Sequence, residues 1–301
     1  MKRIKIGCLG NVTLVAQFVA IVVKYCQNIL YIEMTFDVDD TAATVLFNSL
    51  ERIESIVIHN CDDFTRNSFR FLKSKCAELR ELDLCCLPSF TDDALLAISR
   101  SCLNLRVLNV STCQMIGYKG VIAMLRSCPL LEEVQLSNMP ADVTAAAVKV
   151  LAAAKDCTAL PLRALTIDKL STKKLWAIVA KYLLLSQLRV TDCAGWADWS
   201  CCLRGFTALS LWRLPSLTLT EARQLVSSNP QLTDLSLTVK DRVSAATVLC
   251  LLDGLPALQT LSVRTADSSW EHRQEAGTVQ VLEVMARRLY PSLHRVTICL
   301  L

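Results

Sequence analysis

Two residues that could perform nucleophilic chemistry, His59 and Cys85, occupy matching places in neighbouring segments of this 301-residue chain, and Asp83 lies near them in the sequence. A reactive cysteine needs a base within hydrogen-bond reach of its thiol, and a carboxylate can orient that base. The surrounding sequence contains no recognisable oxyanion-hole loop and no other group in an evident catalytic role. We therefore predict that the protein is not an enzyme.

The sequence also contains no motif that would bind a metal ion or a cofactor. Adjacent cysteines occur at Cys85–Cys86 and Cys201–Cys202 without C-x-x-C spacing, and the three histidines lie far apart in the sequence. The chain has only eight glycines, and none belongs to a phosphate-binding loop. We expect neither a bound metal nor a cofactor.

The charge distribution limits the classes of partner. The formal net charge is +4, and the 32 Lys and Arg residues are interspersed with 28 Asp and Glu residues. Proteins that bind nucleic acids normally have clustered Lys and Arg residues, and this sequence has no such cluster. No apolar stretch approaches the roughly 18 uninterrupted residues of a membrane-spanning helix. We expect no nucleic acid and no membrane as a partner.

The first 26 residues share some features with a secretion signal. Basic residues precede the apolar stretch 14–23, but Gln17 interrupts that stretch and no clean cleavage site follows it. A sequon at Asn109 lies within a predicted strand, where a glycan would fill the face of the sheet. We predict a cytoplasmic or nuclear location, and a secreted recognition protein stays as an alternative.

The fold that positions the candidate residues is indicated by a repeated sequence pattern. The pattern L-x-x-L-x-L, with any aliphatic residue allowed at L, occurs twelve times, mostly 26 residues apart. Its first positions are Met1, Ile29, Ile53, Leu79, Leu105, Leu131, Leu162, Leu185, Phe206, Leu232, Leu258 and Leu293.

Each repeat contains two hydrophobic periods. Residues 82–84 alternate as in a strand, whereas Leu95, Ile98 and Cys102 follow the spacing of one helix face. One strand–turn–helix unit cannot bury both apolar faces, so neighbouring units must stack. The predicted fold is an α/β leucine-rich-repeat solenoid, a right-handed horseshoe with a parallel sheet on its concave face and helices on its convex face.

We predict one domain over residues 1–301 with about twelve units, irregular at 131–206 and 258–293. Residues with capping oxygens or first-turn acids mark the expected helix starts. They are Thr91 with Asp92 and Asp93, Ser171–Thr172, and Thr220–Glu221.

Cysteines recur at two places in the repeat, just after the strand and at the end of the helix. A small, soft side chain suits both crowded corners. With these cysteines the repeat resembles the cysteine-containing class of leucine-rich repeat, best known from F-box proteins that select substrates for cullin-based ubiquitin ligases. The residues on that pattern are Cys61, Phe64–Thr65, Cys76, Phe90–Thr91, Cys102, Cys113 and Cys128.

The resemblance implies that the protein is the substrate-binding part of an F-box/cullin (SCF-type) ubiquitin ligase, acting in ubiquitin-dependent protein catabolism. No F-box is visible, because residues 1–6 already match a repeat strand. A contact with the ligase adaptor would then need a segment outside this chain. The alternative is a stand-alone scaffold or inhibitor that binds one protein without a ligase.

The same pattern predicts a binding face. Apolar positions point into the solenoid, so the third, fifth and seventh positions should face the concave side. The candidate partner-binding residues are Glu81, Asp83, Asn109, Glu133, Gln135, Asp168, Arg189, Trp212 and Arg264.

Trp212 stands out because an indole on a polar face can anchor a partner, although it could instead fold over a neighbouring repeat. Trp196 and Trp199 are expected to fill gaps in the irregular part of the chain. A polar insertion at 265–277 adds the loop candidates Trp270 and His272. Such a loop can carry specificity, or it can be a solvated loop without a role.

Overall fold

The computed structural model describes residues 3–7, 12–26, 28–35, 39–49, 52–61, 76–153, 160–193, 196, 199–265, 290 and 292–299. The chain divides into a first unit, Met1–Leu162, and a second unit, Arg163–Leu301. The prediction that residues 1–301 form a single domain stays a prediction.

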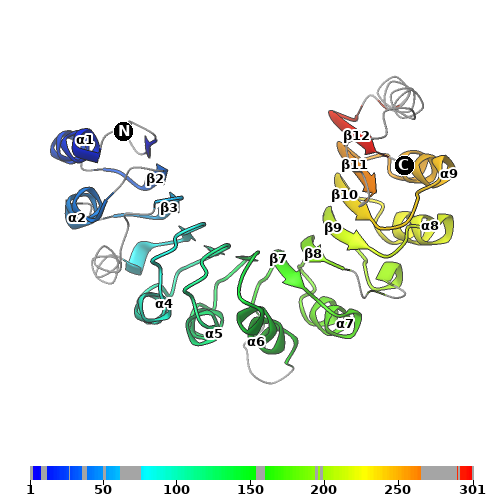
Figure 1. Cartoon of the computed structure of the whole chain (residues 1–301), viewed down its shortest axis with the longest axis horizontal. Coiled ribbons are helices and arrows are strands. Elements are labelled where there is room, and N and C mark those ends of the chain that lie inside the picture. Colours follow the sequence, from blue (N-terminus) through cyan, green and yellow to red (C-terminus); the bar gives the residue numbers. More distant parts are fainter. Residues whose placement is uncertain are drawn as a thin grey trace. The chain divides into compact units, whose positions relative to one another are not determined.

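Strands and helices alternate along the first unit (Figure 1). Its strands pair in parallel and in chain order from β1 to β6. The elements are β1 (Arg3–Ile6), α1 (Val12–Tyr25), β2 (Tyr31–Thr35), α2 (Asp40–Ser49), β3 (Ser55–His59), the 3₁₀ turn η1 (Cys76–Glu78), β4 (Glu81–Asp83), α4 (Asp92–Ser99), β5 (Val107–Asn109), α5 (Tyr118–Ser127), β6 (Glu133–Leu136) and α6 (Ala141–Ala152).

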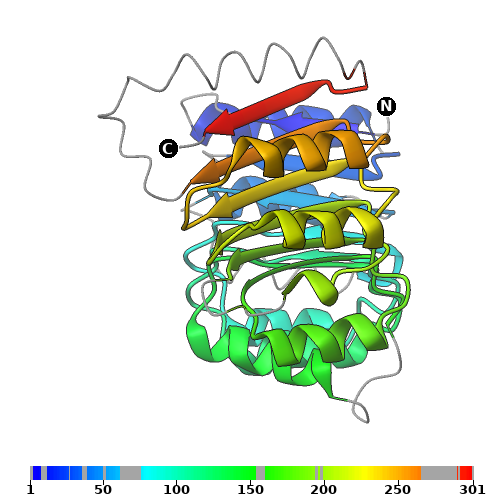
Figure 2. The same ribbon diagram turned by 90° about the vertical axis from the view of Figure 1, so that its right-hand side faces the viewer.

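The second unit continues the alternation, with parallel pairing in chain order from β7 to β12. Figure 2 shows helices α8 and α9 lying beside their strands. The elements are β7 (Ala164–Lys169), α7 (Thr172–Lys181), β8 (Gln187–Asp192), the 3₁₀ turn η2 (Trp199–Cys201), β9 (Ala208–Leu214), α8 (Leu219–Ser228), β10 (Asp234–Val239), α9 (Ala245–Gly254), β11 (Thr260–Thr265) and β12 (Arg295–Cys299).

The strand register follows the repeat predicted from the sequence. Every strand begins at the third position of its L-x-x-L-x-L pattern, as Glu81 does in the repeat that starts at Leu79. The fourth and sixth positions are buried, for example Leu82 and Leu84. The predicted alternation of strand and helix in a parallel sheet is therefore confirmed.

The part of the twelve-stranded sheet in each unit consequently has two different faces. Within each unit the described helices lie on one face (Figure 1). Side chains at the third, fifth and seventh positions lie on the other face, which we call the open face. Because parallel pairing keeps the fifth positions opposite one another, side chains of the same repeat position form rows across the strands.

The core is built from aliphatic side chains of the strands and helices. Leu108 on β5 is fully buried, as are Leu95 and Ile98 on α4. In the short repeat between β8 and β9, η2 takes the place of a full helix. Trp199 is fully buried there and Trp196 is nearly so, which confirms the prediction that these two rings fill the gap.

Two of the three helix starts predicted from capping residues are correct. Thr91 and Ser171 are the N-cap residues of α4 and α7. In the third, Glu221 is a first-turn acid of α8 as predicted, but the cap was wrong by two residues, because α8 is capped by Thr218 and not by Thr220. Thr218 Oγ1 accepts a hydrogen bond from the N–H of Glu221, whose carboxylate accepts the N–H of Thr218. This reciprocal capping box requires a spacing of three residues, which only Thr218 provides.

The repeated cysteines link successive repeats. Cys113 is buried, and its Sγ donates to the carbonyl oxygen of Leu84 in the preceding repeat over 2.8 Å. Cys128 donates in the same way to Cys102 O over 3.3 Å. Burial raises the pKa of the Cys113 thiol to about 12, so this thiol keeps the proton that it donates. The predicted buried position of these cysteines is confirmed.

Candidate protein-interaction surface

Asp83 is the centre of a polar network on the open face of the first unit. Its Oδ1 accepts hydrogen bonds from Asn109 Nδ2 on β5 at 2.9 Å and from the N–H of Cys85 at 3.3 Å. The same oxygen lies 2.8 Å from Nε2 of His59 on β3. One carboxylate therefore connects three neighbouring strands.

The network favours the protonated form of His59. Its contact with the Asp83 carboxylate raises the pKa of His59 above its ordinary value, although partial burial works in the opposite direction. Glu33 on β2 adds a smaller attraction for the imidazolium. The imidazole therefore carries a positive charge over a wider pH range than a free histidine does.

The other carboxylates of this face also bond to neighbouring side chains. Glu81 accepts a hydrogen bond from the hydroxyl of Ser55, and Glu133 accepts one from Gln135 Nε2 at 2.6 Å. The structure thus brings Glu81, Asp83, Asn109, Glu133 and Gln135 together on β4, β5 and β6, where the sequence placed them. Their side chains are partly or largely buried, and Asp83 bonds to Asn109 as Glu133 does to Gln135.

The remaining strand candidates lie on the open face of the second unit. Asp168 on β7 accepts a hydrogen bond from Thr191 Oγ1 at 2.7 Å. Arg189 on β8 and Arg264 on β11 are exposed. Trp212 on β9 is 49 % exposed, and its Nε1 donates to Ser210 Oγ over 3.3 Å. Nearly half of the indole is therefore accessible to a partner.

A β-bulge gives Trp212 this position. Leu211 pairs with Leu237, but Leu214 pairs with Val239, so β9 has one extra residue against β10. Arg213 takes up the extra length with a left-handed backbone, at φ 59°. Its guanidinium lies 3.5 Å from Asp192 on β8. The sequence gives no sign of this bulge beyond the short spacing of the preceding repeat.

The loop candidates Trp270 and His272 lie outside the described residues. Their predicted contribution to binding stays a prediction.

The geometry around Cys85 does not resemble that of an activated nucleophile. Its Sγ lies 3.3 Å from Cys86 Sγ, and burial together with this contact raises the pKa of the Cys85 thiol to about 12. A catalytic cysteine needs the opposite shift, because the thiolate is the nucleophile. His59 is directed to Asp83 instead.

In the described part of the chain, no group of three or more His, Cys, Asp and Glu side chains could hold a metal ion. None of the helices in it is long and apolar enough to cross a membrane.

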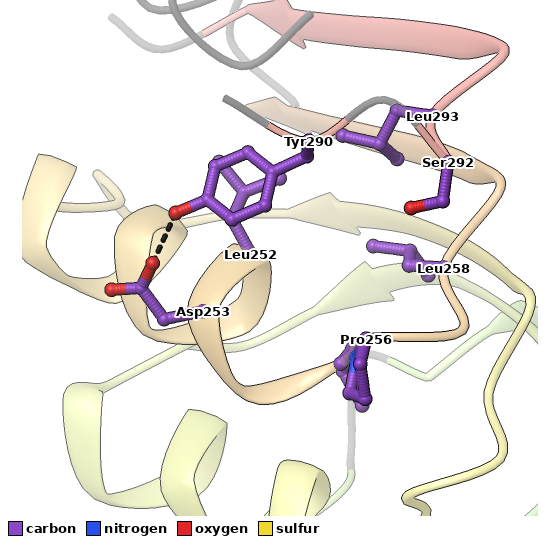
Figure 3. A pocket seen from close by; sticks show the side chains of 8 residues that line it. Leu252, Asp253, Pro256, Leu258, Tyr290, Ser292 and Leu293 are labelled. Atoms are coloured by element: carbon purple, nitrogen blue, oxygen red, sulfur yellow. Dashed lines mark hydrogen bonds between the residues drawn. The ribbon is translucent and has the colours of Figure 1, made fainter. Parts of the chain in front are cut away.

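A cavity of about 390 Å³ lies beside the end of α9 in the second unit (Figure 3). Leu252, Leu258 and Leu293 contribute apolar walls. The hydroxyl of Tyr290 donates to Asp253 at its rim, which raises the pKa of Tyr290. Tyr290 and Asp253 therefore satisfy each other at this rim.

The comparisons with known proteins point to the fold. No family model matches the chain, and no curated protein matches it in sequence. Solved structures do match. A chain of the yeast Rad7–Elc1 complex is similar with a TM-score of 0.61 and 16 % sequence identity, over 91 % of this chain and 72 % of the other. Together with the parallel strands and alternating helices, this likeness shows a leucine-rich-repeat fold.

Proposed function

We propose that the protein is a recognition module that binds another protein through its open face. Two observations carry this proposal: on the open face of the first unit polar side chains are ordered by cross-strand hydrogen bonds, and on the open face of the second unit the indole of Trp212 is half-exposed. Ordered side chains reduce the entropy lost on binding, and a large aromatic side chain is the most common kind of anchor at protein interfaces.

We further propose that this binding serves substrate selection in an F-box/cullin ubiquitin ligase, and thereby ubiquitin-dependent protein catabolism in the cytoplasm or nucleus. Two observations support this role. The buried cysteines Cys61, Cys102, Cys113 and Cys128 follow the repeat pattern of that class. The similar yeast structure is itself a complex of two proteins. Contact with a ligase adaptor would involve a segment outside this chain.

Photo-crosslinking tests where the partner binds. A photoreactive amino acid is placed at Ser236 on the open face of β10, or at Ser227 on the exposed side of α8 as the control. We expect one protein to be attached at Ser236 and not at Ser227. Attachment at Ser227 alone would show that the helices, and not the open face, bind the partner.

Tagged purification from cells tests the ligase role separately. Co-purification of a cullin and its adaptor with the full-length protein supports substrate selection. If an open-face partner is crosslinked but no ligase component co-purifies, the protein is a stand-alone scaffold or inhibitor.

A further inference from the structure

Seven open-face residues of the second unit form two adjoining rows on β8 to β11. In the fifth-position row, Arg189 pairs with Ser210, Ser210 with Ser236, and Ser236 with Ser262. The seventh-position row consists of Trp212, which lies in the bulge, followed by Thr238 and Arg264, which pair with each other. We call this set the arginine–serine patch.

The patch contains two cations and no carboxylate. No carboxylate of the described residues lies within ion-pair distance of Arg189 or Arg264, whereas Arg213 beside them has Asp192 at 3.5 Å. Two acids of the neighbouring strand positions accept hydrogen bonds from threonines, Asp168 from Thr191 and Asp234 from Thr233. Both guanidinium groups are thus exposed donors without a carboxylate partner among the described residues.

The dimensions suit a short extended peptide. Neighbouring strands are about 4.8 Å apart, so the backbones that carry Arg189 and Arg264 are separated by about 14 Å across three strand intervals. An extended chain covers this distance with about four or five residues. The serine side chains between them are short, so a peptide backbone can approach the sheet and meet their hydroxyl groups.

We propose that the arginine–serine patch binds an extended peptide segment that carries carboxylates or phosphates on both sides of a hydrophobic residue. Guanidinium groups bind both kinds of anion through paired hydrogen bonds. The hydrophobic residue packs on the exposed ring of Trp212, and the hydroxyls of Ser236 and Thr238 meet the peptide backbone. This inference rests on the proposed binding function of the open face and names the chemistry of its partner.

A peptide fits the patch better than a nucleic acid does. A nucleic-acid strand needs a continuous basic track and several stacking rings. The patch offers two separated arginines and one indole, in a chain whose net charge is only +4.

Fluorescence polarisation with defined probes tests the proposal on the full chain. The probe is a fluorescein-labelled 10-residue peptide with glutamates on both sides of a central leucine. Three further probes carry phosphoserine, glutamine or lysine at the glutamate positions, and a uridine 10-mer represents nucleic acid. We expect the glutamate or the phosphoserine peptide to bind at least about tenfold more tightly than the glutamine peptide. The ratio of the two anionic peptides distinguishes carboxylate from phosphate.

Two double variants with equal loss of charge identify the site. Arg189→Gln with Arg264→Gln removes the cations of the patch, and Lys173→Gln with Lys174→Gln removes two exposed cations of α7. We expect the first variant to abolish the preference for anionic peptides and the second to retain it. Equal loss in both variants would reveal non-specific charge attraction and overturn the proposal, as would tighter binding of the uridine 10-mer.

The two proposals fail in different ways. A partner could be crosslinked at Ser236 and yet bind the Arg189→Gln, Arg264→Gln variant as tightly as the wild type. In that case the open face binds a protein, but the proposal that the patch binds an anionic peptide is wrong. If no partner is crosslinked at Ser236, the proposed function itself is wrong.

Discussion

Nδ2 of Asn109 on β5 donates a hydrogen bond to Oδ1 of Asp83 on β4 over 2.9 Å. The same carboxylate oxygen lies 2.8 Å from Nε2 of His59 on β3. The centre of the first unit's open face is consequently held in one arrangement by its own side chains. A partner that binds there meets an ordered surface.

We predict that Asp83→Asn lowers the pKa of His59. The carboxylate is the largest cause of the raised value, so an amide in its place leaves mainly the opposing effect of burial. NMR titration of the imidazole measures the change directly, since the chain has only three histidines. An unchanged His59 pKa in the variant would contradict the assigned pair.

The same pair makes a pH-dependent contribution to stability. Because the pKa of His59 is raised in the folded state, this contribution is fully present below the ordinary value of 6.5 and is lost as the pH rises through the folded-state pKa. The difference in free energy of unfolding between wild type and Asp83→Asn should therefore be larger at about pH 5.5 than at about pH 9. Denaturant unfolding at both values measures it, and equal differences would contradict the prediction.

We predict that Leu108→Asp disrupts the first unit. Leu108 is fully buried between the sheet and its helices, so the variant leaves an unpaired charge in the core and costs about 3 kcal/mol or more. Limited proteolysis should then cleave between the neighbouring repeats. Leu183→Asp is the control, because Leu183 is 89 % exposed and its replacement should change stability by less than about 0.5 kcal/mol. Resistance of the Leu108 variant to proteolysis would show that the strand register is wrong.

Loss of the capping box at α8 should cost about 1 kcal/mol in Thr218→Ala. Ser171→Ala is a matched control, because Ser171 is the N-cap of α7 but its side chain makes no capping hydrogen bond. Thermal unfolding of the two variants compares them directly. A larger loss in Ser171→Ala would contradict the assigned caps.

Cys85 should react slowly with iodoacetamide at neutral pH. Its pKa of about 12 leaves almost no thiolate, so alkylation of the folded protein should be slower at Cys85 than at the same residue in the unfolded chain. Mass spectrometry of digested samples at successive times gives both rates. Faster alkylation in the folded protein would contradict this prediction and support the hypothesis that Cys85 is an activated nucleophile.

The repeat pattern predicts the strands and their faces because the side-chain period in a strand is two, so one register decides which residues are buried. Glu81, Asp83 and Gln135 lie where this rule places them. Position alone does not predict the hydrogen-bond partners of these side chains. The partners depend on the side-chain rotamers and on the residues of the neighbouring strands. The sequence could therefore identify Asp83 as a face residue but not as the group that raises the pKa of His59.

Two details depend on geometry that the pattern does not encode. The bulge at Trp212 and Arg213 arises because β9 has one more residue than β10 between the same paired positions. The start of α8 is set by the spacing between Thr218 and Glu221, and Thr220 has only the right residue type. Both depend on local hydrogen bonds, which a search for hydrophobic periods overlooks.

The affinity of the crosslinked partner for two tryptophan variants tests the role of the open face most directly. Trp212 on the open face is 49 % exposed, and Trp176 on α7 is 45 % exposed, so their alanine variants remove the same side chain at similar exposure from opposite faces. We predict that Trp212→Ala weakens binding by about 1–3 kcal/mol with an unchanged melting temperature, and that Trp176→Ala does not weaken it. Equal affinities for both variants, or a lower melting temperature that accounts for the loss in Trp212→Ala, would contradict a partner-binding open face.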